Sequence, residues 1–177
     1  LESHKFEEIR TLFWRNSNLN FNNSSSLIKS LDEKPHMEWL RKIHECEDEK
    51  ALKYFLKDIN FINLKFDEKT LSLLWECCQI PDFVKKTYGN HYQVIGSVFK
   101  FLRSDKGVIS NDYMRLQLMK LDKLDGNVDS LSNRIANVRT WSYVSNKNNW
   151  VENQDYWIEK TKSLEDRLSD RLNEELT

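Results

Sequence analysis

Apolar side chains recur at helical spacing along most of this 177-residue chain. Two stretches, 48–60 and 67–80, each place four apolar residues at positions i, i+3, i+4 and i+7. These residues are Leu52, Phe55, Leu56 and Ile59, then Leu71, Leu74, Trp75 and Cys78. The chain has only 4 glycines and 2 prolines, which is little turn material for a multi-stranded β fold. The sequence therefore predicts an all-α fold, an irregular bundle of about eight or nine helices.

Further helices are predicted from similar stripes and from capping residues. Ser24 to Ser26 are candidate caps for a short helix, Pro35 is expected to open another through Ile43, and Asp67 is expected to cap the helix that Pro81 stops. Ser110 or Asn111 is a candidate cap for the helix that ends before the Asp125-Gly126 turn. The remaining helices are expected at residues 5–15, 82–103, 128–145 and 154–176.

Charge, cysteine content and hydropathy restrict the class of protein. The 27 basic residues nearly balance the 28 acidic ones, so any attraction for nucleic acid must come from a local surface. Cys46, Cys77 and Cys78 form an odd set without paired spacing, which is typical of free thiols in a reducing cytosol. No apolar run approaches the roughly 20 residues that cross a bilayer. We expect a cytoplasmic protein without a membrane partner.

The motifs of catalysis and of cofactor binding are missing from the sequence. The chain lacks the glycine-rich loops that hold phosphates, and no serine or cysteine has an activating neighbour. His36, His44 and Cys46 do not have zinc-ligand spacing. The segment "DKLDGNVDS" lacks most of the oxygen ligands of a calcium loop. We expect no catalytic residue, metal or cofactor in this chain.

The segment "RIANVRTWSYVSNKNNW", residues 134–150, combines cations with aromatic rings and contains no acid. Such a mixture can bind nucleic acid, with Arg134, Arg139 and Lys147 on phosphates and rings stacked on bases. It is equally consistent with a packed helix, in which Trp141 is buried and the arginines pair with the acidic last helix. Residues 152–175 hold eight acids against four bases. Both interpretations remain open from the sequence.

A second group of cations lies between Phe83 and Ser104, where the sequence has no acid. Lys85, Lys86, Lys100 and Arg103 would share the outward face of one predicted helix. Cations without acidic neighbours in the same helix can neutralise phosphates. A solvated helix surface is the alternative. These four residues are the stronger candidates for contact with a nucleic-acid strand.

Three blocks of the sequence resemble a known family. "LLWECCQIPDF" at 73–83, "LDKLDGNVDSLSNRIANVRTWSYVSNKNNW" at 121–150 and "EDRLSDRL" at 165–172 resemble the region after the motor in superfamily II RNA helicases of the mitochondrial-degradosome type, particularly bacterial relatives. "ESHKFEEIRTLFWRN" at 2–16 looks like the segment that leaves their second RecA-like lobe. Lys147, Tyr156 and Asn173 depart from the family pattern, in which Arg, His and His are expected.

The resemblance implies an accessory helical region of an ATP-dependent helicase, with ATP and magnesium held elsewhere in the parent protein. Its partners would be the RecA-like lobes of the same polypeptide, single-stranded RNA or DNA, and proteins of RNA degradation. Residues 1–20 would leave the motor and 21–177 would form the accessory domain, with a division into 21–106 and 107–177 left open. The chain would be cut at both ends. The alternative is a free-standing helical adaptor that binds proteins and no nucleic acid.

Overall fold

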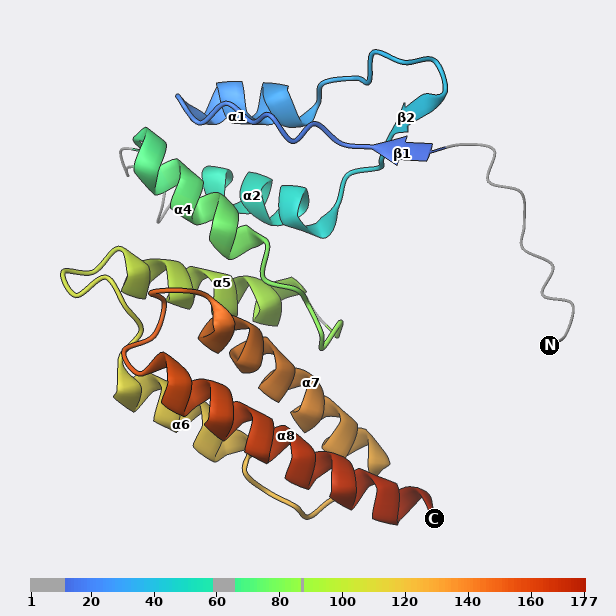
Figure 1. The fold of residues 1–177 in the computed structure, drawn as a ribbon, viewed down its shortest axis with the longest axis vertical. Helices are drawn as coiled ribbons and strands as arrows, with labels where there is room; N and C mark the ends of the chain where they lie inside the picture. Colours follow the sequence, from blue (N-terminus) through green and yellow to red (C-terminus); the bar gives the residue numbers. More distant parts are fainter. Residues whose placement is uncertain (1–11, 59–65, 87) are drawn as a thin grey trace, which may run out of the picture. The chain divides into compact units, whose positions relative to one another are not determined.

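The computed structural model describes residues 12–58, 66–86 and 88–177. Its elements are β1 (Leu12–Trp14), α1 (Ser24–Leu31), β2 (Leu40–Lys42), α2 (Glu47–Lys57), α4 (Glu68–Cys78), α5 (Tyr88–Leu102), α6 (Asn111–Leu121), α7 (Val128–Asn146) and α8 (Gln154–Leu176). Within these ranges the chain is mostly helical, with seven helices and one small sheet (Figure 1). The prediction of an all-α bundle of about eight or nine helices is therefore correct in its helical character and wrong in detail.

The chain forms two compact units, which meet between Trp75 and Glu76 inside α4. This division differs from the boundary after residue 106 that the sequence left open. The assignment of residues 1–20 to a motor exit segment stays a prediction, and its first eleven residues lie outside the described ranges.

The first unit contains the sheet, in which β1 and β2 run parallel. Leu12 pairs with Leu40 and Trp14 with Lys42, and the backbone N–H of Ile43 donates to the carbonyl oxygen of Trp14 at 2.9 Å. Two predicted helices are wrong here: residues 12–14 of the first are a strand, and the helix expected from Pro35 to Ile43 is an irregular segment followed by β2. Strand pairing between distant segments overrides the local helical periodicity.

The helices of the first unit bury most of the stripes that the sequence predicts, although Leu56 of α2 is only half-buried. Asn23, rather than one of the serines, caps α1, because its side chain accepts from the backbone N–H of Ser26 at 2.8 Å. Asp67 caps α4 by accepting from the N–H of Thr70 at 2.7 Å. Ile59 of the predicted α2 stripe lies outside the described residues. The core side chains of this unit are Leu27, Leu31, Ala51, Leu52, Phe55, Leu71, Leu74 and Trp75.

The second unit is built on an antiparallel pair, α7 and α8, with α6 packed against α7 (Figure 1). Ser110 caps α6 and Asn127 caps α7, each through a side-chain oxygen that accepts a backbone N–H. Trp157 begins the buried stripe of α8, and its indole N–H donates to Asn111 Oδ1 at 2.9 Å. The predicted stripes of α7 and α8 are buried at Leu131, Ile135, Val138, Trp141, Val144, Trp157, Thr161, Leu164 and Leu168.

The helix expected over 82–103 starts later than predicted, at Tyr88. Asp82 does not cap it. Its carboxylate instead accepts from the backbone N–H of Lys85 at 3.0 Å, and Lys85 adopts a left-handed φ of 56°. This local turn competes with helical hydrogen bonding, so the segment from Asp82 to Lys86 is not helical. Further on, Ile95 and Phe99 are buried, whereas Tyr92 and Leu102 are half-buried.

All three cysteines are free thiols, with Cys77 and Cys78 buried and Cys46 half-buried. Burial is the largest cause that raises the pKa of the Cys77 thiol. Among the described helices, none is both long and apolar enough to cross a membrane.

Candidate nucleic-acid interface

Arg134 lies on α7, where it holds the end of the α6–α7 connection. Its guanidinium donates to the carbonyl oxygens of Lys123, at 2.7 Å, and Asp125. The Asp125 carboxylate lies 4.0 Å away, and the Arg134 side chain is 18% exposed. Gly126 sits in this turn with φ of 113°, a conformation that L side chains rarely adopt. These contacts commit Arg134 to the fold.

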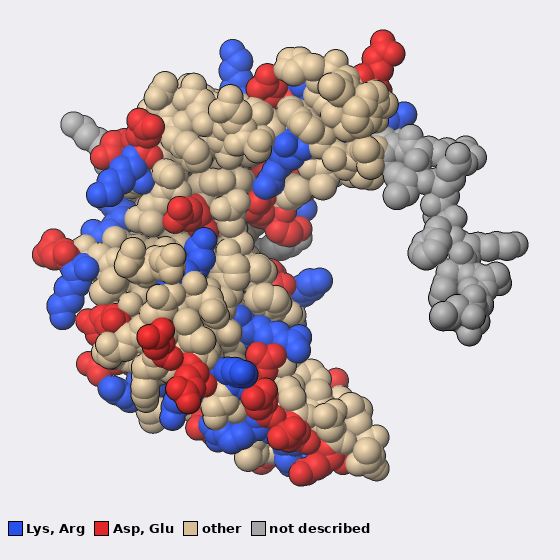
Figure 2. Space-filling model, viewed as in Figure 1, with Lys and Arg blue, Asp and Glu red and all other residues tan. Residues whose placement is uncertain are grey.

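Arg139 forms an interhelical ion pair, which is one of the two interpretations that the sequence left open. Its Nε donates to Glu165 Oε1 at 2.9 Å, which links α7 to α8 across their outer surface. Figure 2 shows acidic and basic side chains intermixed along the part of the surface occupied by these helices. The pair satisfies part of the charge of Arg139, although 54% of its side chain is exposed.

Lys147 follows α7 and lies against two aromatic rings. Its Nζ is 5.9 Å from the centroid of Tyr143 and 5.4 Å from that of Trp150, within range for cation–π attraction. Trp150 is only 4% exposed, and its carbonyl oxygen accepts from the N–H of Ile109 at 2.8 Å. Burial raises the pKa of the Tyr143 hydroxyl, with smaller contributions from Glu76 and Cys77. The aromatic residues of the 134–150 segment thus pack internally.

Two arginines of the segment provide a matched test. We expect Arg134→Ala to lower the free energy of unfolding by about 1–3 kcal/mol, because two carbonyl oxygens of the α6–α7 connection lose a charged donor. Arg139→Ala should cost only about 0–1 kcal/mol, because its ion pair is exposed. Denaturant unfolding followed by far-UV circular dichroism would measure both. Equal losses would contradict the structural role assigned to Arg134.

The other predicted cations do not form one helical face, and that prediction is wrong. Lys85 and Lys86 precede α5, whereas Lys100 lies near its end and Arg103 just beyond it. A rise of about 1.5 Å per residue places about 20 Å between the two pairs along the helix axis. All four side chains are exposed, and within the described ranges none forms an ion pair. Arg103 lies 5.4 Å from the ring centroid of Phe99.

Lys86 lines two cavities of the second unit. One has a volume of about 270 Å³ and lies between α5 and α7, with amide side chains from both helices. The other, of about 330 Å³, lies at the start of α7. Asn133 contributes to both cavities. Of the predicted cations, Lys86 lines both cavities and Arg134 lines the second one, where its guanidinium is already engaged by carbonyl oxygens.

The amides of the first cavity, Asn90, Asn133 and Asn137, are not among the residues predicted from the sequence. The signal was weak: Asn133 and Asn137 stand four positions apart on one side of α7, but solvated helices often show such spacing. The cavity forms only because α5 packs beside the side of α7 that carries these two residues.

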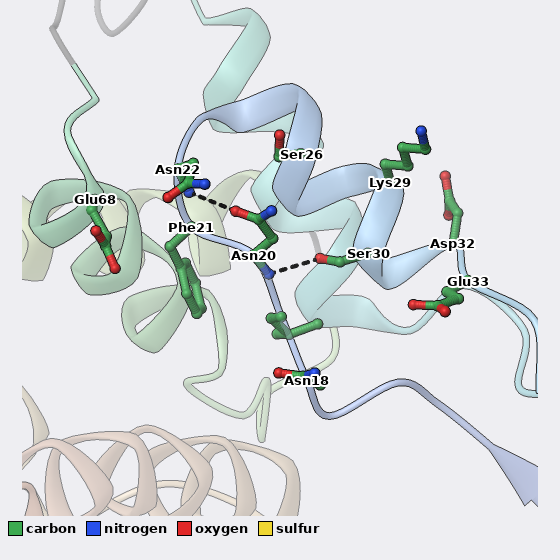
Figure 3. A pocket seen from close by; sticks show the side chains of 11 residues that line it. Asn18, Asn20, Phe21, Asn22, Ser26, Lys29, Ser30, Asp32, Glu33 and Glu68 are labelled. Carbon is green, nitrogen blue, oxygen red and sulfur yellow. Dashed lines mark hydrogen bonds between the residues drawn. The ribbon is translucent and has the colours of Figure 1, made fainter.

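A cavity of about 1020 Å³ lies in the first unit between residues 18–22, α1 and the start of α4. Ser30 Oγ accepts from the backbone N–H of Asn20 at 3.1 Å, which holds the segment on α1. The side chains of Lys29 and Asp32 point away from those of Phe21 and Glu68 (Figure 3). Three acids and one lysine line the cavity, so its charge disfavours a nucleic-acid backbone.

A part-buried charge cluster joins Arg15, which follows β1, to the start of α2 in the first unit. Arg15 donates to Asp48 Oδ1 at 2.8 Å and to Glu49 Oε1 at 3.4 Å, and its guanidinium lies 5.5 Å from the centroid of Trp75. Cys46, Asp48 and Glu49 offer ligand atoms within 4.8 Å of one another. Arg15 already occupies the two carboxylates, so the cluster is a structural ion pair.

Comparison with known proteins adds no assignment: no family model, no curated protein and no solved structure matches the chain.

Proposed function

We propose that the chain is the accessory helical region of an ATP-dependent helicase of the mitochondrial-degradosome type, which packs on the RecA-like motor lobes and helps to guide a single nucleic-acid strand. The three blocks that carry the resemblance support this proposal, since the longest of them corresponds to α7 with its two flanking connections and another lies within α8. ATP and magnesium would be bound by the motor lobes and not by this chain.

The observation that carries the proposal is the apolar surface around β1 and β2. Phe13 is 62% exposed and Trp39 is 58% exposed, and Leu12, Met37 and Ile43 are exposed beside them in sequence or in register. Figure 2 shows uncharged side chains gathered over this part of the first unit. Clustered exposed apolar residues are typical of a surface that binds a partner.

The sheet itself supports the same conclusion. Parallel sheets are normally covered on both faces, and two strands alone are marginal in water. Each strand of the pair also leaves one edge of backbone groups open to another strand. The segment that contains β1 is the one that resembles the exit from the second RecA-like lobe. We therefore assign the apolar surface to contact with that lobe.

Contact with a strand is supported by the division of the predicted cations into two sets. Arg134, Arg139 and Lys147 are engaged by carbonyl oxygens, a carboxylate and aromatic rings, respectively. The exposed set, Lys85, Lys86, Lys100 and Arg103, makes no ion pair within the described ranges and is available to phosphates.

Docking is tested by mixing the 177-residue chain with separately expressed motor lobes from the same reading frame and following heat by titration calorimetry. We expect association, weakened about tenfold or more by Trp39→Glu, because a central aromatic often dominates an interface. Met119→Glu is the matched control, since Met119 is 63% exposed on α6. That variant should bind as the unaltered chain does.

The reading frame upstream of Leu1 supplies the second check and should encode a Walker-type phosphate loop. A start codon close to Leu1, absence of association, or equal weakening by both variants would contradict the proposal. Capture of an unrelated protein through the Trp39 surface, without nucleic-acid binding, would favour the alternative of a free-standing adaptor.

A further inference from the structure

The cavity between α5 and α7 is lined mainly by polar side chains, among them Asp82, Lys86 and His91. Asn90 and Gln93 reach it from α5, and Asn133, Asn137 and Thr140 reach it from α7. The last three recur at i, i+4 and i+7, so they form one polar stripe on a helix whose opposite side is apolar. Carboxamides present a donor and an acceptor side by side, the pattern that matches the edge of a nucleobase.

One atom of this stripe lacks a partner. Within the described part of the chain, Oδ1 of Asn133 is buried and accepts no hydrogen bond. An unsatisfied buried acceptor destabilises a protein and calls for an explanation. Because this oxygen is not accessible as the side chain lies, rotation of the Asn133 side chain into the adjoining cavity would offer it to a ligand that donates a hydrogen bond.

The neighbouring polar side chains of α7 donate to backbone carbonyl oxygens of their own helix. Asn137 Nδ2 donates to the carbonyl oxygen of Asn133 at 2.9 Å, and the hydroxyl of Thr140 donates to that of Ala136 at 3.4 Å. The unsatisfied acceptor of Asn133, its Oδ1, therefore favours ligands with an N–H or amino group at their edge. Adenine and cytosine carry such an amino group beside a ring nitrogen that accepts.

The second cavity extends the site toward a phosphate. Lys86 and Asn133 line both cavities. A ligand that occupies both cavities would therefore lie beside the exposed ammonium group of Lys86. Arg134 also lines the second cavity, but its guanidinium is engaged by carbonyl oxygens. Asp129 lines this cavity as well. Its negative charge offsets part of the positive charge of Lys86 and Arg134, so the cavity suits one phosphate and not several.

The volume of the first cavity favours one base over a longer ligand. At about 270 Å³ it lies near the lower end of the range of about 300–1,000 Å³ that is usual for small-molecule sites. An extended peptide would need a groove that continues along the helices. A single unstacked base, with its sugar and phosphate in the second cavity, fits the two volumes.

We propose that the cavity between α5 and α7 binds one unstacked, amino-bearing base of a single-stranded nucleic acid, with Asn133 as its hydrogen-bond acceptor and Lys86 beside the adjoining phosphate. This inference rests on the strand contact in the proposed function. It adds a base-selective subsite to a surface that would otherwise act through charge alone.

The test compares the binding of fluorescent 12-residue oligoadenylate, oligocytidylate, oligouridylate and an abasic strand of the same length to the full chain at low salt. We expect about tenfold tighter binding of the adenine and cytosine strands than of the abasic strand, as for one stacked or paired base. Asn133→Leu should remove this discrimination and leave the salt dependence unchanged, because the phosphate contacts remain.

Protein stability separates the binding role from a structural one. Asn133→Leu should keep or raise the midpoint of thermal unfolding, since it replaces an unsatisfied amide by an apolar group of similar shape. Asn146→Leu is the control on α7, because Asn146 is exposed and lies away from the cavity. Its Nδ2 donates to the carbonyl oxygen of Ser142 at 2.7 Å, as Asn137 Nδ2 donates to that of Asn133. The Asn146 variant should retain base discrimination.

Equal affinity for base-containing and abasic strands would overturn the subsite, even if the chain docks on the motor lobes. Retention of discrimination by Asn133→Leu would overturn it as well. Stabilisation of the chain by a capped dipeptide, but not by adenosine or cytidine monophosphate, would assign the cavity to a peptide instead. Failure of docking alone would contradict the helicase proposal and leave the subsite standing.

Discussion

Trp157→Ala is expected to lower the free energy of unfolding of the second unit by about 3–5 kcal/mol, the range for removal of a large buried aromatic side chain. Trp157 is 2% exposed and lies at the start of α8, where its indole N–H donates to Asn111 Oδ1. The substitution therefore leaves a void and removes the donor to Asn111. Denaturant unfolding should be followed by far-UV circular dichroism, because the substitution also changes tryptophan fluorescence.

Two further variants separate the contribution of the indole N–H from that of the buried ring. Trp157→Phe retains most of the ring volume and removes only the N–H donor, so we expect a loss of about 1–2 kcal/mol. Tyr156→Ala, at a neighbouring aromatic that is 55% exposed, should cost no more than about 1 kcal/mol for its edge-to-face contact with Trp157. A loss at Tyr156 as large as that at Trp157 would contradict the assignment of Trp157 to the core.

Arg15→Ala is expected to lower the free energy of unfolding of the first unit by about 3 kcal/mol at about pH 7.5, because it leaves the Glu49 carboxylate buried without its cation. The side chain of Glu49 is 2% exposed. Burial raises the pKa of Glu49, and the hydrogen bond and charge of Arg15 oppose that increase. Removal of Arg15 should therefore raise the pKa further.

The direction of the pH dependence follows from this shift. A carboxyl group whose pKa is higher in the folded than in the unfolded state favours folding at low pH, and this contribution is lost as the pH rises through the folded value. The deficit of Arg15→Ala should thus be smaller at about pH 4 than at about pH 7.5. Unfolding measured at both pH values would show whether the deficit shrinks as expected.

A double variant tests the cause. Arg15→Ala combined with Glu49→Gln should recover most of the lost stability at neutral pH, since no unpaired carboxylate remains at position 49. Arg41→Ala is the control, because Arg41 is an exposed arginine of β2. It should change stability by less than about 0.5 kcal/mol. A deficit at position 15 that is independent of pH would point to lost packing against Trp75 instead.

The elements that could be predicted from the sequence are those with strong local signals. Helix α4 carries both a four-point apolar stripe and the capping oxygen of Asp67, and the structure confirms both. Helix α8 extends over the predicted residues. In each case the information lies within a few turns of one helix, where side-chain spacing and backbone donors determine the outcome.

The elements that could not be predicted depend on distant partners or on a local competitor. The apolar residues near Met37 and Trp39 have helical spacing, but pairing of 40–42 with 12–14 makes a strand of the residues that follow. The Asp82 carboxylate holds a turn at Lys85 and delays the start of α5, so the four cations lose their common face. Charge runs identified the candidate cations, but not which of them were already engaged.

The sequence by itself determined the helical character of this protein and the buried side of its longer helices, because both follow from the periodicity of apolar residues. It left the pairing of Arg139 with the acidic last helix as one of two interpretations, and the structure supplies the ion pair. Only the tertiary structure decided that Arg134 holds the α6–α7 connection and that the amides of α5 and α7 enclose one cavity. Such arrangements depend on the packing of helices that are separated along the chain, and local spacing carries no information about it.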